Sequence, residues 1–371
     1  MRVALELQPC CSRRSGIGIY TYELVKRMHE DDYLSFRGNL FKFFLMKNDS
    51  ALQEIRFPID YIKIMPYGIY RRIWSVLPVS YQKMFPNGAD ITHFFNYIVP
   101  PGVKGKVIDT VYDLVFLRYP ETMDKRNLAR ISKGLVRSLE QSDAIITDSF
   151  FIKEEIMRQY GIKSDIIHVV YPAASLTETN ITMPEITKKW NIKIPYILYV
   201  GNIEPRKNLE RLINAYEIFR KEMPGRIQLV LAGGKGWCSE SIYKSAENSN
   251  YCEDIVFTGY VSDEEKSALY KNADLFVFPS IYEGFGIPVL EAMECSVPVV
   301  CSGVSSLPEV IGGNALFVNP FSVQDIAEKL IIGISDRKLA EKQAVSAKAR
   351  AELFSWDKSA QKLIEIYKSM G

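Results

Sequence analysis

Two glutamates and a glycine-rich turn follow an apolar segment near residue 280 of the 371-residue chain. The segment 273–278 (ADLFVF) is expected to form a strand, and Glu283 comes shortly after its end. Gly286 lets the backbone turn sharply and approach a ligand, and Pro288 suits the first turn of a helix, where its missing N–H costs little. Glu291 lies further along that helix. The pattern predicts a strand, a tight turn and a helix N-terminus.

A helix N-terminus after a glycine-rich turn is suited to binding an anion. The unpaired N–H groups of the first turn and the helix dipole both favour negative charge there. A carboxylate cannot favourably face a phosphate, so Glu283 and Glu291 are expected to accept hydrogen bonds from hydroxyl groups on either side. The ligand that fits is a phosphate between hydroxylated groups: a sugar, a diphosphate and a ribose. The alternative is an ordinary strand-to-helix turn, and the spacing alone does not separate the two.

The stretch EGFGIPVLEAM, in which seven residues separate Glu283 from Glu291, resembles the signature of the family 4 glycosyltransferases. The resemblance implies a retaining enzyme of the two-domain GT-B fold. In that family the first glutamate contacts the donor sugar and the second holds the ribose of the nucleotide. The donor-binding residues that the resemblance implies in this stretch are Glu283, Gly284, Phe285, Gly286, Ile287 and Glu291.

Two cations follow another expected strand, residues 196–200 (YILYV). Arg206 and Lys207 precede a helix for which Asn208 is a good N-cap. The helix dipole repels both cations, and an anion bound between them and the helix end would remove the conflict. Arginine offers a planar fork to phosphate oxygens and lysine a point charge. The stretch is similar to the family's G-x-x-x-x-R-K-N-L element, which implies that Arg206 and Lys207 hold the donor diphosphate.

A glycine turn near the N-terminus is a further candidate. Gly16 and Gly18 follow an expected strand over residues 2–7, and a helix is expected from Ile19. A dinucleotide-binding fingerprint would need a third glycine where this chain has Thr21, so a tight turn is the simpler interpretation. The family resemblance implies a glycine loop close to the donor phosphates, and Gly16 and Gly18 match it.

Residues at other strand ends complete the candidates. Asp113 follows an expected strand, and binding groups in parallel sheets gather at the carboxyl ends of strands. The family has His-Asp here, whereas this chain has Tyr112, whose phenol is no equivalent proton carrier at neutral pH. His93 is better explained as a hydrogen-bonded core residue. Tyr260 closes the strand 255–258, where the resemblance implies contact with the nucleotide base.

Composition limits the classes of function. Hydrophobic residues make up 47% of the chain and charged residues 24%, which is ordinary for a globular protein. The net charge of +2 and the lack of a basic tract argue against nucleic-acid binding. Six cysteines without a C-x-x-C pair and only three histidines argue against a zinc site or a disulfide framework. No Asp-x-Asp element follows a strand, so we expect neither a metal nor another cofactor.

Strands and helices alternate along the chain, which predicts two Rossmann-like doubly wound α/β domains facing a cleft. We expect an acceptor-binding domain over residues 1–172 and a nucleotide-sugar-binding domain over residues 191–356. The polar, aperiodic stretch 173–190 is the expected linker. The resemblance implies that the C-terminal helix, residues 357–371, crosses back to the first domain.

The stretch 61–85 is basic and aromatic. A helix there with Arg71 and Arg72 could lie on an anionic membrane surface. The alternative, which is the commoner use of such a pattern, is an amphipathic helix packed on its own domain. No run of about 18 apolar residues occurs, so no membrane-spanning helix is expected. We expect a cytoplasmic protein, with peripheral contact at the inner membrane face as the alternative that this stretch leaves open.

These observations predict a retaining hexosyltransferase that moves a hexose from a nucleotide diphosphate sugar to a glycan or lipid-linked glycan. The chain as a whole resembles bacterial mannosyl- and rhamnosyl-type transferases of polysaccharide and O-antigen biosynthesis, and GDP-mannose is the expected donor. The expected catalytic residues are Glu283, Arg206, Lys207 and Asp113. The alternatives are a rhamnosyl- or glucosyl-type transferase using a dTDP- or UDP-sugar, a nucleotide-sugar epimerase, and a non-catalytic binder.

Overall fold

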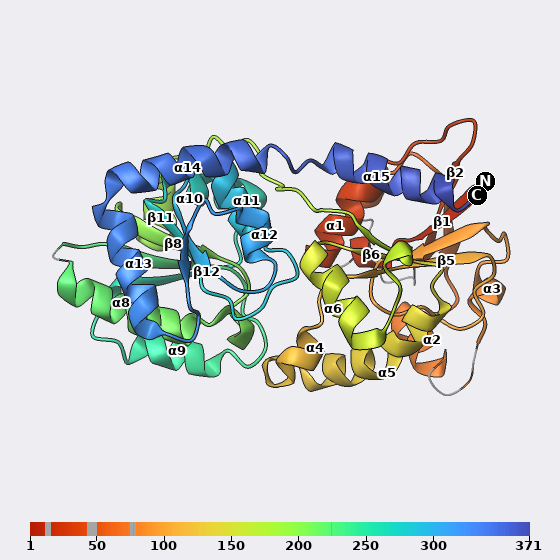
Figure 1. The fold of residues 1–371 in the computed structure, drawn as a ribbon, viewed down its shortest axis with the longest axis horizontal. Coiled ribbons are helices and arrows are strands. Elements are labelled where there is room, and N and C mark those ends of the chain that lie inside the picture. Colours follow the sequence, from red (N-terminus) through yellow and green to blue (C-terminus); the bar gives the residue numbers. More distant parts are fainter. Residues whose placement is uncertain (12–15, 43–49, 75–76, 78, 224) are drawn as a thin grey trace. The chain divides into compact units, whose positions relative to one another are not determined.

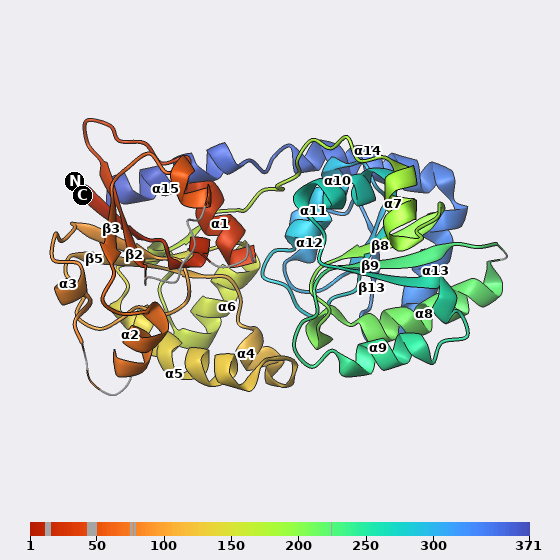
Figure 2. The ribbon, with the colours of Figure 1, turned by 180° about the vertical axis from the view of Figure 1, so that it is seen from behind.

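The computed structural model describes residues 1–11, 16–42, 50–74, 77, 79–223 and 225–371. These residues form two compact units, each with its own parallel β-sheet and its own helices (Figures 1 and 2). The expected pair of doubly wound α/β domains is confirmed. Unit 1 contains Met1–Leu114, Arg126–Pro172 and Ser355–Gly371, and unit 2 contains Val115–Lys125 and Ala173–Phe354.

Within the described residues, the sheet of unit 1 has seven parallel strands in the order β3-β2-β1-β4-β5-β6-β7. The strand order reverses at β1, which has β2 on one side and β4 on the other. The inner strands are mostly buried, as expected for a parallel sheet covered on both faces. The strands are β1 (Arg2–Glu6), β2 (Ser35–Phe41), β3 (Ile59–Ile62), β4 (Ile91–Phe94), β5 (Lys106–Val111), β6 (Ala144–Thr147) and β7 (Ile167–Val169).

The helices of unit 1 include the last helix of the chain, α15 (Trp356–Ser369), which packs beside α1 (Figure 1). An ion pair of 2.7 Å between Arg27 and Asp357 and a second ion pair between Lys368 and Asp31 attach α15 to this unit. The return of the C-terminal helix to the first domain is therefore confirmed. The other helices are α1 (Gly16–Val25), α2 (Tyr67–Trp74), α3 (Tyr81–Met84), α5 (Lys125–Gln141) and α6 (Phe150–Tyr160), with 3-10 turns at Gln8–Cys11, Ser50–Glu54 and Ser164–Ile166.

The sheet of unit 2 has six parallel strands among the described residues, in the order β10-β9-β8-β11-β12-β13. Its strand order reverses at β8, between β9 and β11. The strands are β8 (Tyr196–Val200), β9 (Gln228–Ala232), β10 (Ile255–Gly259), β11 (Leu275–Phe278), β12 (Val299–Ser302) and β13 (Leu316–Val318). The helices are α4 (Val115–Arg118), α7 (Met183–Trp190), α8 (Leu209–Glu222), α9 (Glu240–Glu247), α10 (Asp263–Asn272), α11 (Ile287–Glu294), α12 (Leu307–Ile311), α13 (Val323–Ser335) and α14 (Arg337–Ala351), with 3-10 turns at Pro120–Thr122, Pro205–Lys207 and Cys252–Asp254.

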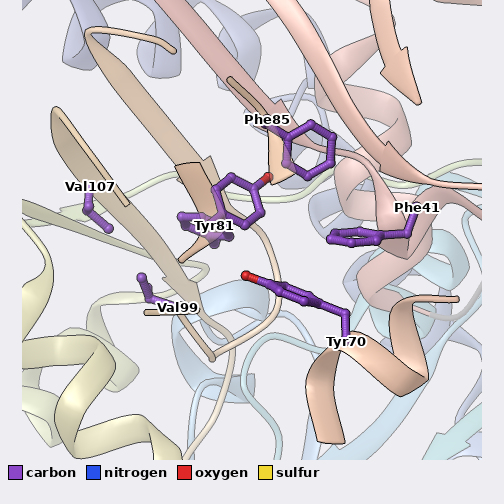
Figure 3. Close-up of a cluster of buried hydrophobic side chains, with 7 residues drawn as sticks. Phe41, Tyr70, Tyr81, Phe85, Val99 and Val107 are labelled. Carbon is purple, nitrogen blue, oxygen red and sulfur yellow. The ribbon is translucent and has the colours of Figure 1, made fainter. Parts of the chain in front are cut away.

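The aromatic residues of the stretch 61–85 contribute to the core of unit 1. Tyr70 is fully buried and stacks on Phe41, with ring centroids 4.8 Å apart (Figure 3). Tyr81 and Phe85 join the same cluster. The stretch therefore packs on its own domain, and its contact with a membrane stays a prediction. None of the helices in the described part of the chain is both long enough and apolar enough to cross a bilayer.

Three local features differ from the sequence analysis. The stretch 173–190, expected to be an aperiodic linker, contains α7, because the side chain of Glu185 accepts from the backbone of Thr182 at 2.7 Å in a capping box. Helix α1 begins at Gly16 rather than Ile19. The segment Val115–Lys125 belongs to unit 2 by its contacts, although the sequence analysis assigned it to residues 1–172.

Candidate functional site

The strongest candidate site of unit 2 lies at the carboxyl ends of two neighbouring strands. Strands β8 and β11 pair in parallel at the point where the strand order reverses. The loop after β8 carries Arg206 and Lys207 in a 3-10 turn, and the loop after β11 carries Glu283. Ligands in open α/β sheets bind at such a reversal, and the sequence candidates from both loops meet there.

Backbone and side-chain hydrogen bonds join the two loops. The N–H of Ile281 donates to the carbonyl of Arg206 at 3.0 Å. The amide of Asn208 donates to the carbonyl oxygens of Pro279 and Pro320, at 3.0 and 2.6 Å. Asn208 occupies the N-cap position of α8 in the left-handed conformation, with φ 63°, and its side chain makes no cap hydrogen bond. Asn208 thus occupies the predicted N-cap position, but its side chain does not cap the helix, because its amide connects three loops instead.

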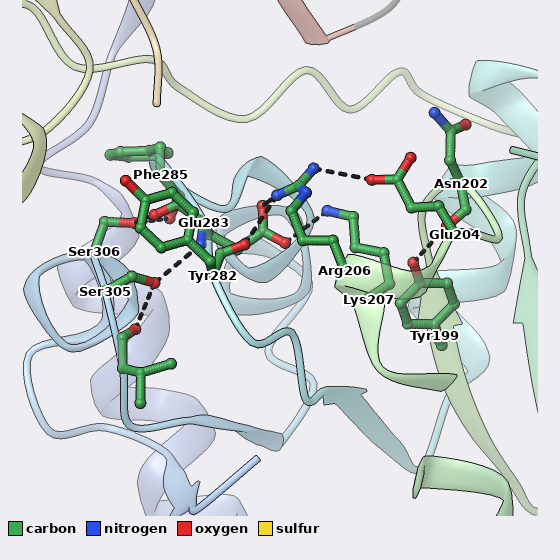
Figure 4. A network of polar contacts seen from close by, with 11 residues as sticks. Tyr199, Asn202, Glu204, Arg206, Lys207, Tyr282, Glu283, Phe285, Ser305 and Ser306 are labelled. Atoms are coloured by element: carbon green, nitrogen blue, oxygen red, sulfur yellow. Dashed lines mark hydrogen bonds and ion pairs between the residues drawn. The ribbon is translucent and has the colours of Figure 1, made fainter. Parts of the chain in front are cut away.

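A buried network of charges occupies this position (Figure 4). The guanidinium of Arg206 donates to Glu283 at 2.8 Å and to Glu204 at 3.0 Å. The ammonium of Lys207 donates to the other oxygen of Glu283 at 2.6 Å and lies 4.9 Å from the ring centre of Phe278. Glu204, Glu283 and Lys207 are 2%, 6% and 7% exposed, so these ion pairs are shielded from water.

The network neutralises itself, since it contains two cations and two carboxylates. From the sequence, a bound anion was expected to offset the charges of Arg206 and Lys207, and the role of Glu204 was not predicted. One oxygen of Glu204 accepts from Arg206, and the other is buried without a hydrogen-bond partner among the described residues. An acidic residue two positions before Arg206 was the sequence signal that could have revealed this pair.

The environment of Glu283 determines its charge. Burial by itself would raise the pKa of this carboxyl, but the charges of Arg206 and Lys207 outweigh burial and lower the pKa to about 2. Glu283 is therefore ionised at any physiological pH. An ionised carboxylate accepts hydrogen bonds only, which suits it to orient sugar hydroxyls and makes it a poor proton donor.

Two serines from the loop after β12 hold the backbone of Glu283. The N–H of Glu283 donates to the hydroxyl of Ser305 at 3.0 Å, and the hydroxyl of Ser306 donates to the carbonyl of Glu283 at 2.9 Å (Figure 4). Ser306 is fully buried, and Ser305 adopts a φ of 55°. Neither serine is among the residues predicted from the sequence, because nothing local marks a contact that spans more than twenty residues.

The turn before α11 has the predicted geometry. Gly286 is the N-cap residue with φ 101°, a conformation that residues with a side chain rarely adopt. A Cβ at this position would lie 2.6 Å from the side chain of Leu307. Pro288 occupies the first turn of α11, as expected. Gly284, Phe285 and Ile287 lie on the same loop and helix start.

Glu291 has a separate set of partners on α10. Its carboxylate pairs with the ammonium of Lys266, and the hydroxyl of Tyr270 lies 3.1 Å from its other oxygen. Burial raises the pKa of Glu291, and the charge of Lys266 offsets this only in part. Glu291 thus lies on the helix that begins four residues after Glu283 but does not contact the cations of Arg206 and Lys207.

The remaining candidates are distributed over both units. Tyr260 follows β10 in unit 2 and is 72% exposed. Gly16 and Gly18 lie in the first turn of α1, and Asp113 lies two residues after β5, all in unit 1. His93 is buried, with its ring nitrogens 2.7 Å from the hydroxyl of Tyr367 and 2.8 Å from that of Thr110, so the expected core role is confirmed.

The described residues contain no group of three or more histidine, cysteine, aspartate or glutamate side chains that could hold a metal ion. Of the six cysteines, Cys10 and Cys301 are buried, whereas Cys238 and Cys252 are exposed. The expectation of a transferase without a metal or another cofactor stays a prediction.

Comparisons with known proteins bear on the family of this chain. The family described as "Glycosyl transferases group 1" matches residues 183–350, which include every charged residue of the network. The O-antigen chain mannosyltransferase B of Escherichia coli is 30% identical over 388 residues, covering 99% of this chain and 100% of the relative. The chain belongs to the glycosyl transferases of group 1. The serotype-specific mannosyltransferase WbdA of Escherichia coli is 28% identical to this glycosyltransferase. The match covers 92% of this chain but only 44% of WbdA.

Solved structures support the fold of this glycosyltransferase. Sucrose-phosphate synthase from Thermosynechococcus elongatus superposes with a TM-score of 0.77 at 19% identity, covering 100% of this chain and 98% of the other. Anabaena Alr3699/HepE in complex with UDP and glucose also gives 0.77, at 16% identity with full coverage of both chains. Both sheets and the helices around them match the GT-B fold, as expected.

Proposed function

We propose that this glycosyltransferase moves a mannosyl group from GDP-mannose to a glycan or lipid-linked glycan during the assembly of a surface polysaccharide. The observation that carries the proposal is the likeness to an O-antigen chain mannosyltransferase over 99% of the chain. The network of Arg206, Lys207 and Glu283 supports a sugar nucleotide as the donor, because it offers two cations for a diphosphate and an ionised acid for sugar hydroxyls.

The proposed chemistry depends on the charge that develops on the departing nucleoside diphosphate. Arg206 and Lys207 are fixed in place by Glu283, so they stabilise this charge without reorganising at the moment of reaction. The first turn of α11, which begins four residues after Glu283, adds unpaired N–H groups. In this proposal Glu283 orients the hydroxyls of the sugar and is not the nucleophile.

We further propose transfer with retention, in which the acceptor hydroxyl attacks from the face that the diphosphate leaves. The bond from the sugar carbon to the diphosphate oxygen breaks, the bond to the acceptor oxygen forms, and the acceptor proton passes to the departing diphosphate. This route needs no basic residue at Tyr112. Burial raises the pKa of the Tyr112 phenol, and its hydroxyl donates to the carbonyl of Phe95 at 2.9 Å, so this residue stays neutral.

A panel of sugar nucleotides tests the proposal. The purified chain is incubated with GDP-mannose, dTDP-rhamnose and UDP-glucose, each with and without membrane extract from a polysaccharide-producing bacterium. We expect release of GDP from GDP-mannose that depends on the extract, together with mannose incorporated with the anomeric configuration of the donor. Inverted product would contradict retention, and preference for dTDP- or UDP-sugar would contradict the proposed donor.

The same panel separates the other classes of function. A nucleotide-sugar epimerase would convert the sugar without any acceptor. A non-catalytic binder would bind a sugar nucleotide in titration calorimetry and release no nucleoside diphosphate with any extract. Either result would overturn the proposed transfer.

A further inference from the structure

A second buried acid contacts Arg206, and the proposed chemistry gives it no role. Glu204 lies between β8 and the 3-10 turn that carries Arg206 and Lys207. It is 2% exposed, and acidic side chains are almost never buried so completely unless they are paired. The partner of Glu204 is Arg206, a group on which the proposed mechanism depends. The function of Glu204 therefore follows from what it does to Arg206.

The guanidinium of Arg206 is held at both of its terminal nitrogens. Nη1 donates to the carboxylate of Glu283 at 2.8 Å and to the carbonyl of Tyr282 at 2.9 Å. Nη2 donates to Glu204 at 3.0 Å (Figure 4). Because the guanidinium is planar and rigid, acceptors at both nitrogens fix the plane of the whole fork. Glu204 thus contributes to the orientation of the group that would face a diphosphate.

A ligand can reach Arg206 but not the acid beside it. The side chain of Arg206 is 16% exposed, whereas that of Glu204 is 2% exposed. One oxygen of Glu204 holds Arg206, and the other is enclosed without a hydrogen-bond partner among the described residues. An enclosed carboxylate does not touch a substrate. Glu204 therefore acts on the reaction through Arg206.

The base of the Glu204 side chain is fixed by the loop after β9. The N–H of Gly236 donates to the carbonyl of Ile203 at 3.0 Å, and the N–H of Ile203 donates to the carbonyl of Gly234 at 2.9 Å. A Cβ on Gly236 would lie 3.1 Å from the Cβ of Glu204. The absence of a side chain at Gly236 lets the two loops approach closely. Glu204 is consequently directed at Arg206 from a rigid base.

Stability alone does not account for this acid. A buried ion pair often stabilises a fold no more than well-packed apolar side chains do. A buried oxygen without a hydrogen-bond donor is an additional cost to folding. Both considerations favour a role for Glu204 in the site.

The charge of Glu204 changes what the site does to an anion. With Glu204, the network has two cations and two carboxylates, and without it the network would carry a net positive charge. A positive network binds a diphosphate more tightly. The effect is largest for the product, because breaking the bond to the sugar leaves a terminal phosphate whose second pKa is about 6, so it carries an additional charge at neutral pH. Glu204 therefore limits how tightly Arg206 and Lys207 retain the nucleoside diphosphate.

We propose that Glu204 is a positioning residue of the donor site with two effects. Its carboxylate fixes the plane of Arg206, and its charge keeps the network neutral so that the nucleoside diphosphate is released after transfer. The proposal rests on the transfer activity proposed above and adds one residue to its site.

Two substitutions separate the two effects. Glu204→Asp keeps the charge but shortens the side chain, so Arg206 loses its hold and kcat should fall about tenfold. Glu204→Gln keeps the length and an oxygen for Arg206 but loses the charge, so kcat should fall only about threefold. Initial rates with GDP-mannose and membrane extract measure both. Glu210→Gln, at an exposed position of α8, is the matched control and should change nothing.

Binding of the product gives the opposite order. GDP, UDP and dTDP are titrated into the full chain by calorimetry without divalent metal, and the nucleotide that wild type binds most tightly is compared among the variants. We expect Glu204→Gln to lower its Kd about fivefold and Glu204→Asp to leave it within about twofold of wild type. A merely structural role would weaken binding in both variants, so the tighter binding of Glu204→Gln distinguishes the proposal from a folding defect.

The outcomes separate failure of this role from failure of the proposed function. If wild type binds none of the three nucleotides, the proposed function fails and this role fails with it. If wild type binds one of them and Glu204→Gln binds it equally or more weakly, only the role of Glu204 is overturned. Thermal unfolding identifies a variant that does not fold. If that variant is Glu204→Gln, then Glu204→Asp decides: a kcat lowered at least fivefold at wild-type affinity supports the role, and any other result overturns it.

Discussion

Two buried glutamates, one in each unit, have nearly the same exposure but differ in charge, since Glu6 is mostly neutral at pH 7 and Glu283 is ionised. Glu6 in unit 1 is 4% exposed, and burial raises its pKa to about 8. Glu283 in unit 2 is 6% exposed, and although burial opposes ionisation, Arg206 and Lys207 hold its pKa at about 2. Burial alone therefore does not decide whether these two acids are ionised. The cations beside Glu283 keep it ionised.

The contrast also separates two environments of a buried acid. The network around Glu283 in unit 2 carries matched charges that are already paired, so its geometry is fixed before any ligand binds. The surroundings of Glu6 in unit 1 differ, because burial dominates its pKa and its carboxyl accepts a hydrogen bond from the N–H of Gln8 at 3.0 Å. Four changes of conditions or sequence test this comparison.

Glu283→Gln should have the largest effect. The amide keeps the shape of the side chain but removes the charge that holds Arg206 and Lys207, so we expect kcat to fall by roughly 10²–10³. Initial rates with GDP-mannose and membrane extract measure the loss. Glu253→Gln, at an exposed position of the same unit, is the matched control. A fall of less than about fivefold would refute the role of Glu283 in the reaction.

Lys207→Met should raise the pKa of Glu283, so that this acid becomes more like Glu6. Removing one partner of a buried ion pair leaves the other charge uncompensated, so we expect a loss of about 3–5 kcal/mol in the free energy of unfolding. Guanidinium unfolding at pH 7 measures this, with the exposed Lys221→Met as the control.

The depressed pKa of Glu283 favours the folded state above pH 4.5 and loses this effect as the pH falls toward 2, so the variant should also be less sensitive to acid. Unchanged acid sensitivity would argue that Lys207 has little influence on Glu283.

Glu6→Gln should stabilise the protein in the alkaline range. Since the folded pKa of Glu6 lies near 8 and its ordinary value is 4.5, the folded state binds the proton more tightly, and stability falls as the pH rises from 4.5 to 8. We expect the variant to be more stable than wild type at pH 8, by on the order of a few kcal/mol, and nearly equal at pH 4.5. Melting temperatures at both pH values check this, with exposed Glu30→Gln as the reference. A variant that gains nothing at pH 8 would mean that the carboxyl of Glu6 ionises freely.

Removal of divalent metal should have the smallest effect. If Arg206 and Lys207 stabilise the departing diphosphate, transfer in excess EDTA should stay within about twofold of the untreated rate. The rates are compared before and after dialysis into EDTA and after addition of Mg²⁺. A loss of activity that Mg²⁺ reverses would contradict the proposal that Arg206 and Lys207 stabilise the departing diphosphate without a metal ion.

Much of the candidate site of unit 2 could be predicted from the sequence, because its signals are local. A glycine with positive φ, a proline in the first helical turn and acids at a fixed spacing all lie within the few residues from Glu283 to Glu291. Arg206 and Lys207 were identified in the same way, by their position between a strand and a helix.

The rest of the site depends on contacts between distant segments. Ser305 and Ser306 hold Glu283 from another loop, and Asn208 bonds Pro279 and Pro320 and does not cap its helix. A sequence pattern gives the conformation of a short segment but not which other segment it will contact. The doubly wound class of each sheet followed from the alternation of strands with helices, whereas the unit to which Val115–Lys125 belongs did not.

That last segment has a practical consequence for dissecting the protein. The indole N–H of Trp237 donates to the carbonyl of Thr122 at 2.5 Å, and the rings of Tyr119 and Tyr282 lie 6.1 Å apart. The chain changes unit after Leu114, Lys125, Pro172 and Phe354. A fragment cut at Ala173 would leave this indole without its acceptor and uncover an aromatic ring beside Glu283. Expressing unit 2 alone therefore requires that the eleven residues Val115–Lys125 be joined back to it, because a single cleavage point does not separate the units.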